Sequence, residues 1–84
     1  MSRIRILLAD GHPVVRNGVK FLLQNDASLE IVGEAADGLQ VLTLIDQVKP
    51  DVLILDISMP GMSGIECIKE VKSRAKTIKI VVFT

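Results

Sequence analysis

Four short aliphatic runs alternate along this chain with stretches in which apolar residues recur at helical spacing. The runs occupy residues 4–9, 29–34, 52–55 and 79–84. Strands that alternate with helices of about ten residues form consecutive βαβ units, and the strands of such units are parallel. The alternation therefore predicts an α/β fold built on a parallel sheet, with right-handed crossover connections.

The stretches between these runs have the pattern of amphipathic helices. Pro13 stands where the first helix begins, Gly38 opens the second, and the third follows a turn at residues 59–61. The run at 29–34 alternates apolar and polar residues, which is typical of an edge strand, whereas the run at 52–55 is wholly apolar, which is typical of a central strand. The three apolar helix stripes consist of Val15, Val19, Leu22 and Leu23, then Val41, Leu44, Ile45 and Val48, then Gly64, Cys67, Ile68 and Val71.

The composition limits the number of domains, the classes of partner and the expected cellular location. The 84 residues are too few for two domains and marginal for one well-buried core, and a hydrophobic content of 49% excludes a disordered chain. Ten basic and ten acidic side chains cancel, so no net charge favours nucleic acid or a membrane surface. No apolar run reaches the roughly 18 residues of a membrane span, and the start of the chain lacks a signal-peptide layout. The single cysteine, Cys67, cannot form an internal disulfide, and we expect a cytoplasmic location.

Two of the predicted strands end in aspartate and a third ends in threonine. Ligands of open α/β sheets bind at the carboxyl ends of the strands, where the strand order reverses. In the flavodoxin-like order 2-1-3-4-5, Asp10, Asp56 and Thr84 converge on that point. Two carboxylates can hold Mg²⁺, and an aspartate can be the nucleophile that forms an acyl phosphate. The three residues together favour such a phosphoryl-transfer site, while each aspartate taken singly also fits a turn or a helix cap.

His12 follows Asp10 by two residues. A histidine can bind a metal or act as a base, but no second histidine or cysteine is near in the sequence, and Pro13 follows directly. We therefore expect His12 to be an ordinary loop histidine. Cys67 lies on the apolar stripe of the third helix, and we expect it in the core.

Four segments of the chain resemble receiver domains of response regulators of the NarL/FixJ type. They are IRILLADGHP at residues 4–13, GEAADG at 33–38, PDVLILDISMPGMSG at 50–64 and IVVFT at 80–84. The third segment is highly specific, because an aspartate, a Met-Pro-Gly turn and a glycine follow an apolar strand at fixed offsets. The resemblance covers essentially the whole chain and implies a flavodoxin-like (CheY-like) doubly wound parallel sheet of order 2-1-3-4-5.

The resemblance also implies roles for individual residues. Asp56 is identified as the phosphoacceptor, Asp10 as the first member of an acidic pair, and Ser58 as a residue whose backbone carbonyl binds Mg²⁺. Thr84 is similar to the hydroxyl residue that contacts the phosphoryl group and shifts when it arrives. The family takes phosphate from a sensor histidine kinase or from small donors, so this chain would be no enzyme beyond a Mg²⁺-dependent transfer to its own aspartate.

NarL/FixJ-type regulators usually carry a helix-turn-helix DNA-binding domain after the receiver and control transcription, and a homodimer is compatible with the family. This chain ends at Thr84, before the fourth helix, fifth strand and fifth helix of the family. We expect residues 1–84 to be a partial receiver domain, with on the order of 30–40 further receiver residues outside the chain. Any contact with DNA would then run through a domain absent from this chain, and no contact with a membrane is expected.

One residue departs from the family pattern. Where the family has Asp-Asp-His-Pro, this chain has Asp10-Gly11-His12-Pro13, so the second carboxylate of the acidic pair is missing. Because Mg²⁺ sites rely on few protein ligands, we expect weakened Mg²⁺ binding and slow phosphorylation of Asp56. The alternative is a degenerate interaction module that works without phosphorylation. A phosphohydrolase would need a second aspartate where Ser58 stands, and a Rossmann module would need a G-x-G-x-x-G segment that the chain lacks.

Overall fold

The computed structural model describes residues 3–59 and 61–83, and strands and helices alternate throughout these ranges. The strands are β1 (Ile4–Ala9), β2 (Leu29–Ala35), β3 (Val52–Asp56) and β4 (Lys79–Phe83). The helices are α1 (Pro13–Leu23), α2 (Gly38–Val48) and α3 (Gly64–Arg74). Each predicted strand is present with bounds that differ by at most one residue. None of the helices in the described ranges is long and apolar enough to cross a membrane.

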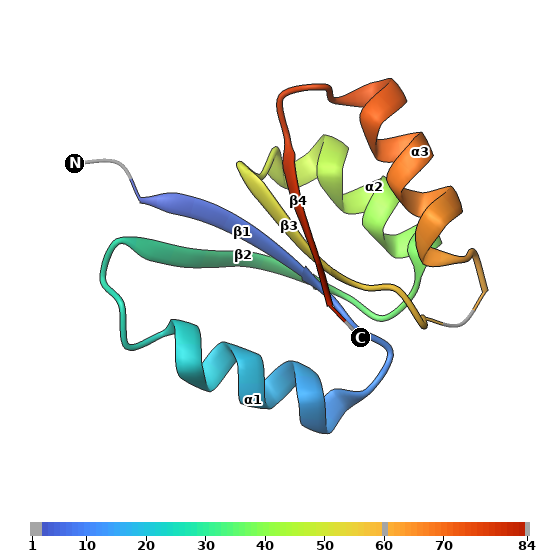
Figure 1. The fold of residues 1–84 in the computed structure, drawn as a ribbon. Helices are drawn as coiled ribbons and strands as arrows, with labels where there is room; N and C mark the ends of the chain where they lie inside the picture. The colour runs from blue at the N-terminus through green and yellow to red at the C-terminus, as the bar shows by residue number, and fades with distance from the viewer. Residues whose placement is uncertain (1–2, 60, 84) are drawn as a thin grey trace.

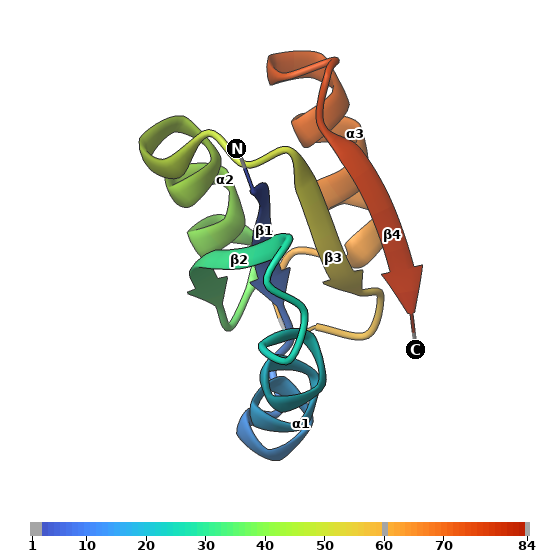
Figure 2. The ribbon, with the colours of Figure 1, turned by 90° about the vertical axis from the view of Figure 1, so that its left-hand side faces the viewer.

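The four strands form one parallel sheet of order β2-β1-β3-β4 (Figures 1 and 2). This order confirms the prediction of a doubly wound α/β sheet, with β2 at an edge and β3 inside. The chain moves outward from β1 to β2 and then crosses back to β3 on the other side of β1. The strand order therefore reverses between β1 and β3, which is where ligands of such sheets bind.

Helices cover the two faces of the sheet unequally, with α1 on one face and α2 and α3 together on the other (Figure 1). Alternate residues of β1 and β3 point into the larger core, because successive side chains of a strand face opposite sides. This core lies between the sheet and the α2–α3 pair. Its fully buried members are Leu7, Ala9, Leu53 and Leu55 from the strands and Val41, Cys67 and Val71 from the helices. Cys67 is buried as expected, and burial raises the pKa of its thiol.

The face that carries α1 is only partly covered. No α1 residue is buried, and Val15 and Leu22 from its predicted apolar stripe are 43% and 71% exposed. The physical reason is that α1 is the only helix on this face within the described ranges, so no second helix packs against its flank. At the far edge of the sheet, β4 likewise leaves Val81 and Val82 exposed.

Candidate functional site

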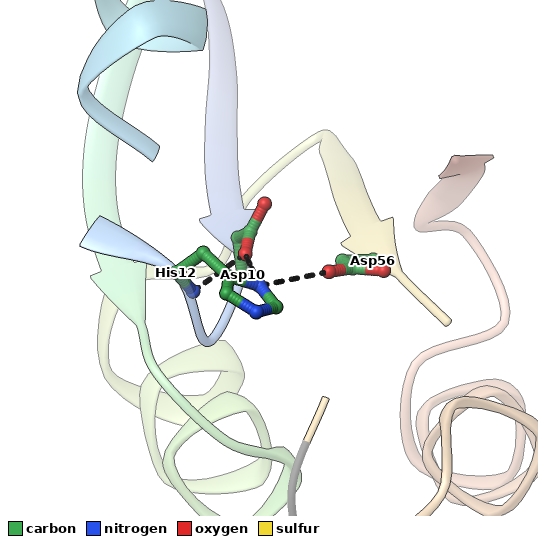
Figure 3. Close-up of side chains that lie close together, drawn as sticks. All are labelled: Asp10, His12 and Asp56. Atoms are coloured by element: carbon green, nitrogen blue, oxygen red, sulfur yellow. Dashed lines mark hydrogen bonds and ion pairs between the residues drawn. The ribbon is translucent and has the colours of Figure 1, made fainter. Parts of the chain in front are cut away.

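Three ionisable side chains lie together at the carboxyl ends of β1 and β3 (Figure 3). Asp10 directly follows β1, and its backbone N–H donates to the Ala35 carbonyl over 3.0 Å. Asp56 is the last residue of β3, and His12 belongs to the loop that leads into α1. One donor atom from each of the three side chains lies within 4.8 Å of the other two. The pairing of β1 with β3 creates this cluster, because parallel neighbouring strands end at the same edge of the sheet.

Asp10 is completely buried. Its Oδ1 accepts the backbone N–H of His12 over 2.7 Å, and its own carbonyl accepts a hydrogen bond from Arg16 Nη1 over 2.7 Å. Its other carboxylate oxygen, Oδ2, is buried and has no hydrogen-bond partner among the described residues. A buried polar atom without a partner is unfavourable, so this oxygen suits a site that receives a ligand.

Asp56 is 5% exposed and is held by Ser58. Its Oδ1 accepts the backbone N–H of Ser58 over 3.0 Å and the Ser58 hydroxyl over 2.9 Å. Burial raises the pKa of Asp56, but the two hydrogen bonds from Ser58, the nearby His12 and the Asp10 side chain together outweigh it, and the pKa lies below its usual range. The side chain is therefore an ionised carboxylate at neutral pH, which is the form that binds cations and attacks phosphorus.

His12 bridges the two carboxylates. Its Nδ1 lies 3.4 Å from Oδ1 of Asp10 and 3.9 Å from Oδ2 of Asp56, and its side chain is 68% exposed. The sequence predicts an ordinary loop histidine, because no second histidine or cysteine is near His12 in the chain. Its neighbours are instead carboxylates from two separate strands. The offset of two residues from Asp10 was the available signal, since it allows the backbone N–H of His12 to bond the Asp10 carboxylate.

The three other residues predicted at the site are Ser58, Gly11 and Thr84. Ser58 lies at the site and contacts Asp56 through its N–H and hydroxyl, while the role of its carbonyl stays a prediction. Gly11 lies between Asp10 and His12 and brings no side chain to the cluster. Thr84 lies outside the described residues.

The donor groups fit a divalent cation in part. Two carboxylates converge, and Oδ2 of Asp10 is buried with no hydrogen-bond partner in residues 3–59 and 61–83, an environment that a bound cation would make less unfavourable. The oxygen ligand that a second acidic residue would add is absent, because Gly11 occupies that position. The site can therefore hold a cation, but with fewer oxygen ligands than Mg²⁺ prefers.

A network of charged residues ties α1 to the strand ends behind this site. Glu34 of β2 accepts from Arg16 Nε over 3.1 Å and from Lys20 Nζ over 2.9 Å. Because Arg16 also bonds the Asp10 carbonyl, the network links β2, α1 and the segment that carries Asp10. The hydrogen bond from Lys20 is the largest influence on Glu34, and together with the bond and charge of Arg16 it holds the pKa of Glu34 below its usual range despite partial burial.

Replacing Lys20 with glutamine is expected to raise the pKa of Glu34 toward its usual value, which a ¹³C NMR titration of the glutamate carboxyl groups measures. The lowered pKa means that the network stabilises the fold above the unfolded-state value of about 4.3, and that this stabilisation is lost as the pH falls through the folded-state pKa. Lys72→Gln on α3 is a matched control and should leave Glu34 unchanged. An equal pKa in the unaltered protein and in Lys20→Gln would contradict the assignment of the shift to Lys20.

Comparison with known proteins identifies the domain type. The family model described as response regulator receiver domain matches residues 6–84. The chain is 42% identical over 81 residues to the uncharacterized transcriptional regulatory protein YhcZ of Bacillus subtilis (strain 168), covering 96% of this chain and 38% of that protein. It is 40% identical over 79 residues to the nitrate/nitrite response regulator protein NarL of Escherichia coli (strain K12), covering 94% of this chain and 37% of that protein. The chain thus spans less than two fifths of the length of these relatives.

Solved structures agree with the sequence comparison. The isolated receiver domain of RcsB from Salmonella enterica serovar Typhimurium, solved in the presence of the phosphomimetic BeF₃⁻, matches with a TM-score of 0.91 and 31% identity over 96% of this chain and 61% of that chain. The signal receiver domain of a NarL response regulator from Mycobacterium tuberculosis matches with a TM-score of 0.86 and 38% identity over 98% of this chain and 64% of that chain. Both matches confirm the predicted receiver fold.

Proposed function

This chain belongs to the response regulator receiver domain family, and we propose that it accepts a phosphoryl group on Asp56 to control a transcriptional output. The observation that carries the proposal is the position of Asp56 at the carboxyl end of β3, beside the buried Asp10 and with its carboxylate held by Ser58. The use of the phosphomimetic BeF₃⁻ with the RcsB receiver domain supports phosphorylation as the input.

In the proposed reaction, a carboxylate oxygen of Asp56 attacks the phosphorus of a phosphohistidine or a small acyl phosphate. A new O–P bond forms, the bond from phosphorus to the donor breaks, and the donor leaves with the electron pair. Ser58 holds the other carboxylate oxygen through two hydrogen bonds and so orients the nucleophile. A Mg²⁺ ion held by Asp10, Asp56 and the Ser58 carbonyl would neutralise charge on the phosphoryl oxygens, and the Thr84 hydroxyl would contact them after transfer.

The proposed partners follow from the same assignment. Response regulators are regulatory proteins, and the only catalysis that we propose here is the transfer of a phosphoryl group to the protein's own Asp56. The donor would be a sensor histidine kinase. The relatives named as transcriptional regulators, and a solved complex of RcsB with DNA, support a DNA-binding output through a part of the protein outside this chain, with a homodimer as one form of that output.

Intact-mass spectrometry after incubation with acetyl phosphate and Mg²⁺ tests the proposal. We expect the mass of one phosphoryl group to be added, to map to the peptide that contains Asp56, and to be absent when EDTA removes the metal. Uptake is expected to be slow, because Gly11 leaves the cation one carboxylate short.

Gly11 favours a second candidate function, a receiver-like interaction module that works without phosphorylation. This module would show no added mass at any concentration of Mg²⁺ or acetyl phosphate. Uptake only at residues other than Asp56 would also contradict the proposed function.

A further inference from the structure

We propose that Asp10, His12 and Asp56 form a binding site for a divalent transition metal ion of the series from Fe²⁺ to Zn²⁺, with Nδ1 of His12 as a ligand. In this site the imidazole nitrogen takes the place of the oxygen ligand that Gly11 cannot supply. The inference rests on the proposed function for the need of a cation beside Asp56, and it adds a ligand and a class of metal.

The separations between the donor atoms fit a single ion. His12 Nδ1 lies 3.4 Å from Asp10 Oδ1 and 3.9 Å from Asp56 Oδ2. Two atoms that bind the same ion at about 2.1 Å can be at most about 4.2 Å apart, and both separations meet this limit. The two aspartates offer oxygens within 4.8 Å of each other, so these atoms need to approach by no more than about 0.6 Å.

The burial of the two carboxyl groups also favours a cation. Both aspartates are buried, and Oδ2 of Asp10 has no hydrogen-bond partner among the described residues. Within those ranges, His12 is the only basic side chain at ion-pair distance from either carboxylate. Figure 3 shows its ring beside both of them. One imidazole is a single donor group facing two buried carboxyl groups. A divalent ion accepts ligand atoms from both carboxyl groups and from the imidazole at once.

The mixture of donor atoms favours a transition metal over Mg²⁺. Mg²⁺ prefers oxygen ligands in a near-ideal octahedron, whereas imidazole nitrogen suits Zn²⁺ and its neighbours in the first transition row. This chain removes an oxygen ligand at Gly11 and offers a nitrogen at His12. The exposed ring of His12 gives an ion from solvent direct access to that nitrogen.

The competing interpretation is a loop histidine that only hydrogen-bonds Asp10. The backbone N–H of His12 already bonds Asp10 Oδ1 over 2.7 Å, and a purely structural role would end with this bond and the ion pair. The two interpretations differ in one observable: only a metal ligand changes the electronic state of Nδ1 when the metal is added.

Titration of the unphosphorylated protein with Zn²⁺ alone and with Mg²⁺ alone tests the proposal. The chain has one histidine, so the imidazole ¹H–¹⁵N signals of this chain report on His12. We expect Zn²⁺ to shift the ¹⁵N resonance of Nδ1 at stoichiometric addition, and Mg²⁺ to leave it nearly unchanged. Calorimetry is expected to give a lower Kd for Zn²⁺ than for Mg²⁺.

Variants separate the ligand from the rest of the site. His12→Ala is expected to raise the Kd for Zn²⁺ by about 10–100-fold, because removing even a residue that only hydrogen-bonds a metal ligand lowers metal affinity by this factor. The change in the Kd for Mg²⁺ should be much smaller. Gly11→Asp is expected to lower the Kd for Mg²⁺ by adding an oxygen ligand. Asp46→Asn removes an exposed carboxylate on α2, away from the site, and should change neither affinity. Far-UV circular dichroism checks that each variant folds, and the Nδ1 measurement needs no variant.

An Nδ1 resonance that stays unmoved at saturating Zn²⁺, or an unchanged Kd for Zn²⁺ in folded His12→Ala, overturns the proposal. Treating the same preparation with acetyl phosphate distinguishes this failure from failure of the proposed function. Phosphoryl uptake with Mg²⁺ but without an Nδ1 shift refutes the transition-metal site alone. An Nδ1 shift without uptake under any metal supports the site and refutes Asp56 as phosphoacceptor.

Discussion

Replacing Asp56 with asparagine is expected to abolish phosphoryl uptake while leaving the fold intact. Asparagine has the same shape, and its side-chain oxygen can still accept the two hydrogen bonds from Ser58. Its amide is not a nucleophile toward phosphorus, so no acyl phosphate can form. Intact-mass spectrometry after treatment with acetyl phosphate and Mg²⁺ measures the loss, and far-UV circular dichroism with thermal unfolding measures the fold.

Asp46→Asn is the matched control for this experiment. Asp46 lies on α2 with a side chain that is 71% exposed, and its carboxylate makes a 3.9 Å ion pair with Arg74. The same chemical change at this position should leave phosphoryl uptake at the level of the unaltered protein. Persistent uptake by Asp56→Asn would show that another residue is the acceptor. Equal loss of uptake in both variants would show that the added phosphoryl mass does not report on the Asp56 site.

The fold was largely predictable because each element has a local cause in the sequence. The wholly apolar run at 52–55 predicted an interior strand, and β3 lies between β1 and β4. The alternating run at 29–34 predicted an edge strand, and β2 lies at the edge. Helix starts were equally local, since Pro13 opens α1 and the Asp37 side chain accepts the backbone N–H of Gln40 at the start of α2.

The meeting of Asp10 with Asp56 was also predictable, because topology decides it. Both residues end strands, and a parallel sheet brings the carboxyl ends of neighbouring strands to one edge. The contact of His12 with both carboxylates was not predictable in this way. It depends on the direction of a loop side chain, which follows from the hydrogen bond between the His12 N–H and Asp10 rather than from any periodic pattern.

The sequence could not predict how far the side chains of α1 are buried. It also could not predict why residue 64 is a glycine. An apolar stripe such as that containing Val15 and Leu22 shows which side of a helix avoids water, but its burial depends on what packs beside the helix.

Gly64 matched a glycine of the family pattern, and only the structure shows why a glycine is needed there. A Cβ at this position would lie 2.6 Å from the Cα and 2.8 Å from the carbonyl oxygen of Ile57.

Gly64→Ala is expected to destabilise the fold by about 1–3 kcal/mol, the usual cost of inserting a methyl group where no space exists. The contacts are with the backbone of Ile57, so no change of rotamer relieves them, and either the start of α3 or the segment after β3 must move. That segment includes Ser58, which orients Asp56, so we also expect slower phosphoryl uptake by the folded fraction. Urea unfolding measures the free energy, and the loss should appear in the midpoint with little change in the slope.

Gly18→Ala gives the same substitution with the opposite expected sign. Gly18 lies inside α1, and a Cβ there would meet nothing within 4 Å. Alanine in an exposed helix interior is more stable than glycine by roughly 0.5–1 kcal/mol, because it restricts the unfolded chain. We therefore expect Gly64→Ala to lower the urea midpoint and Gly18→Ala to raise it. If Gly64→Ala leaves the midpoint unchanged or raises it, close contact with Ile57 is not what keeps residue 64 a glycine.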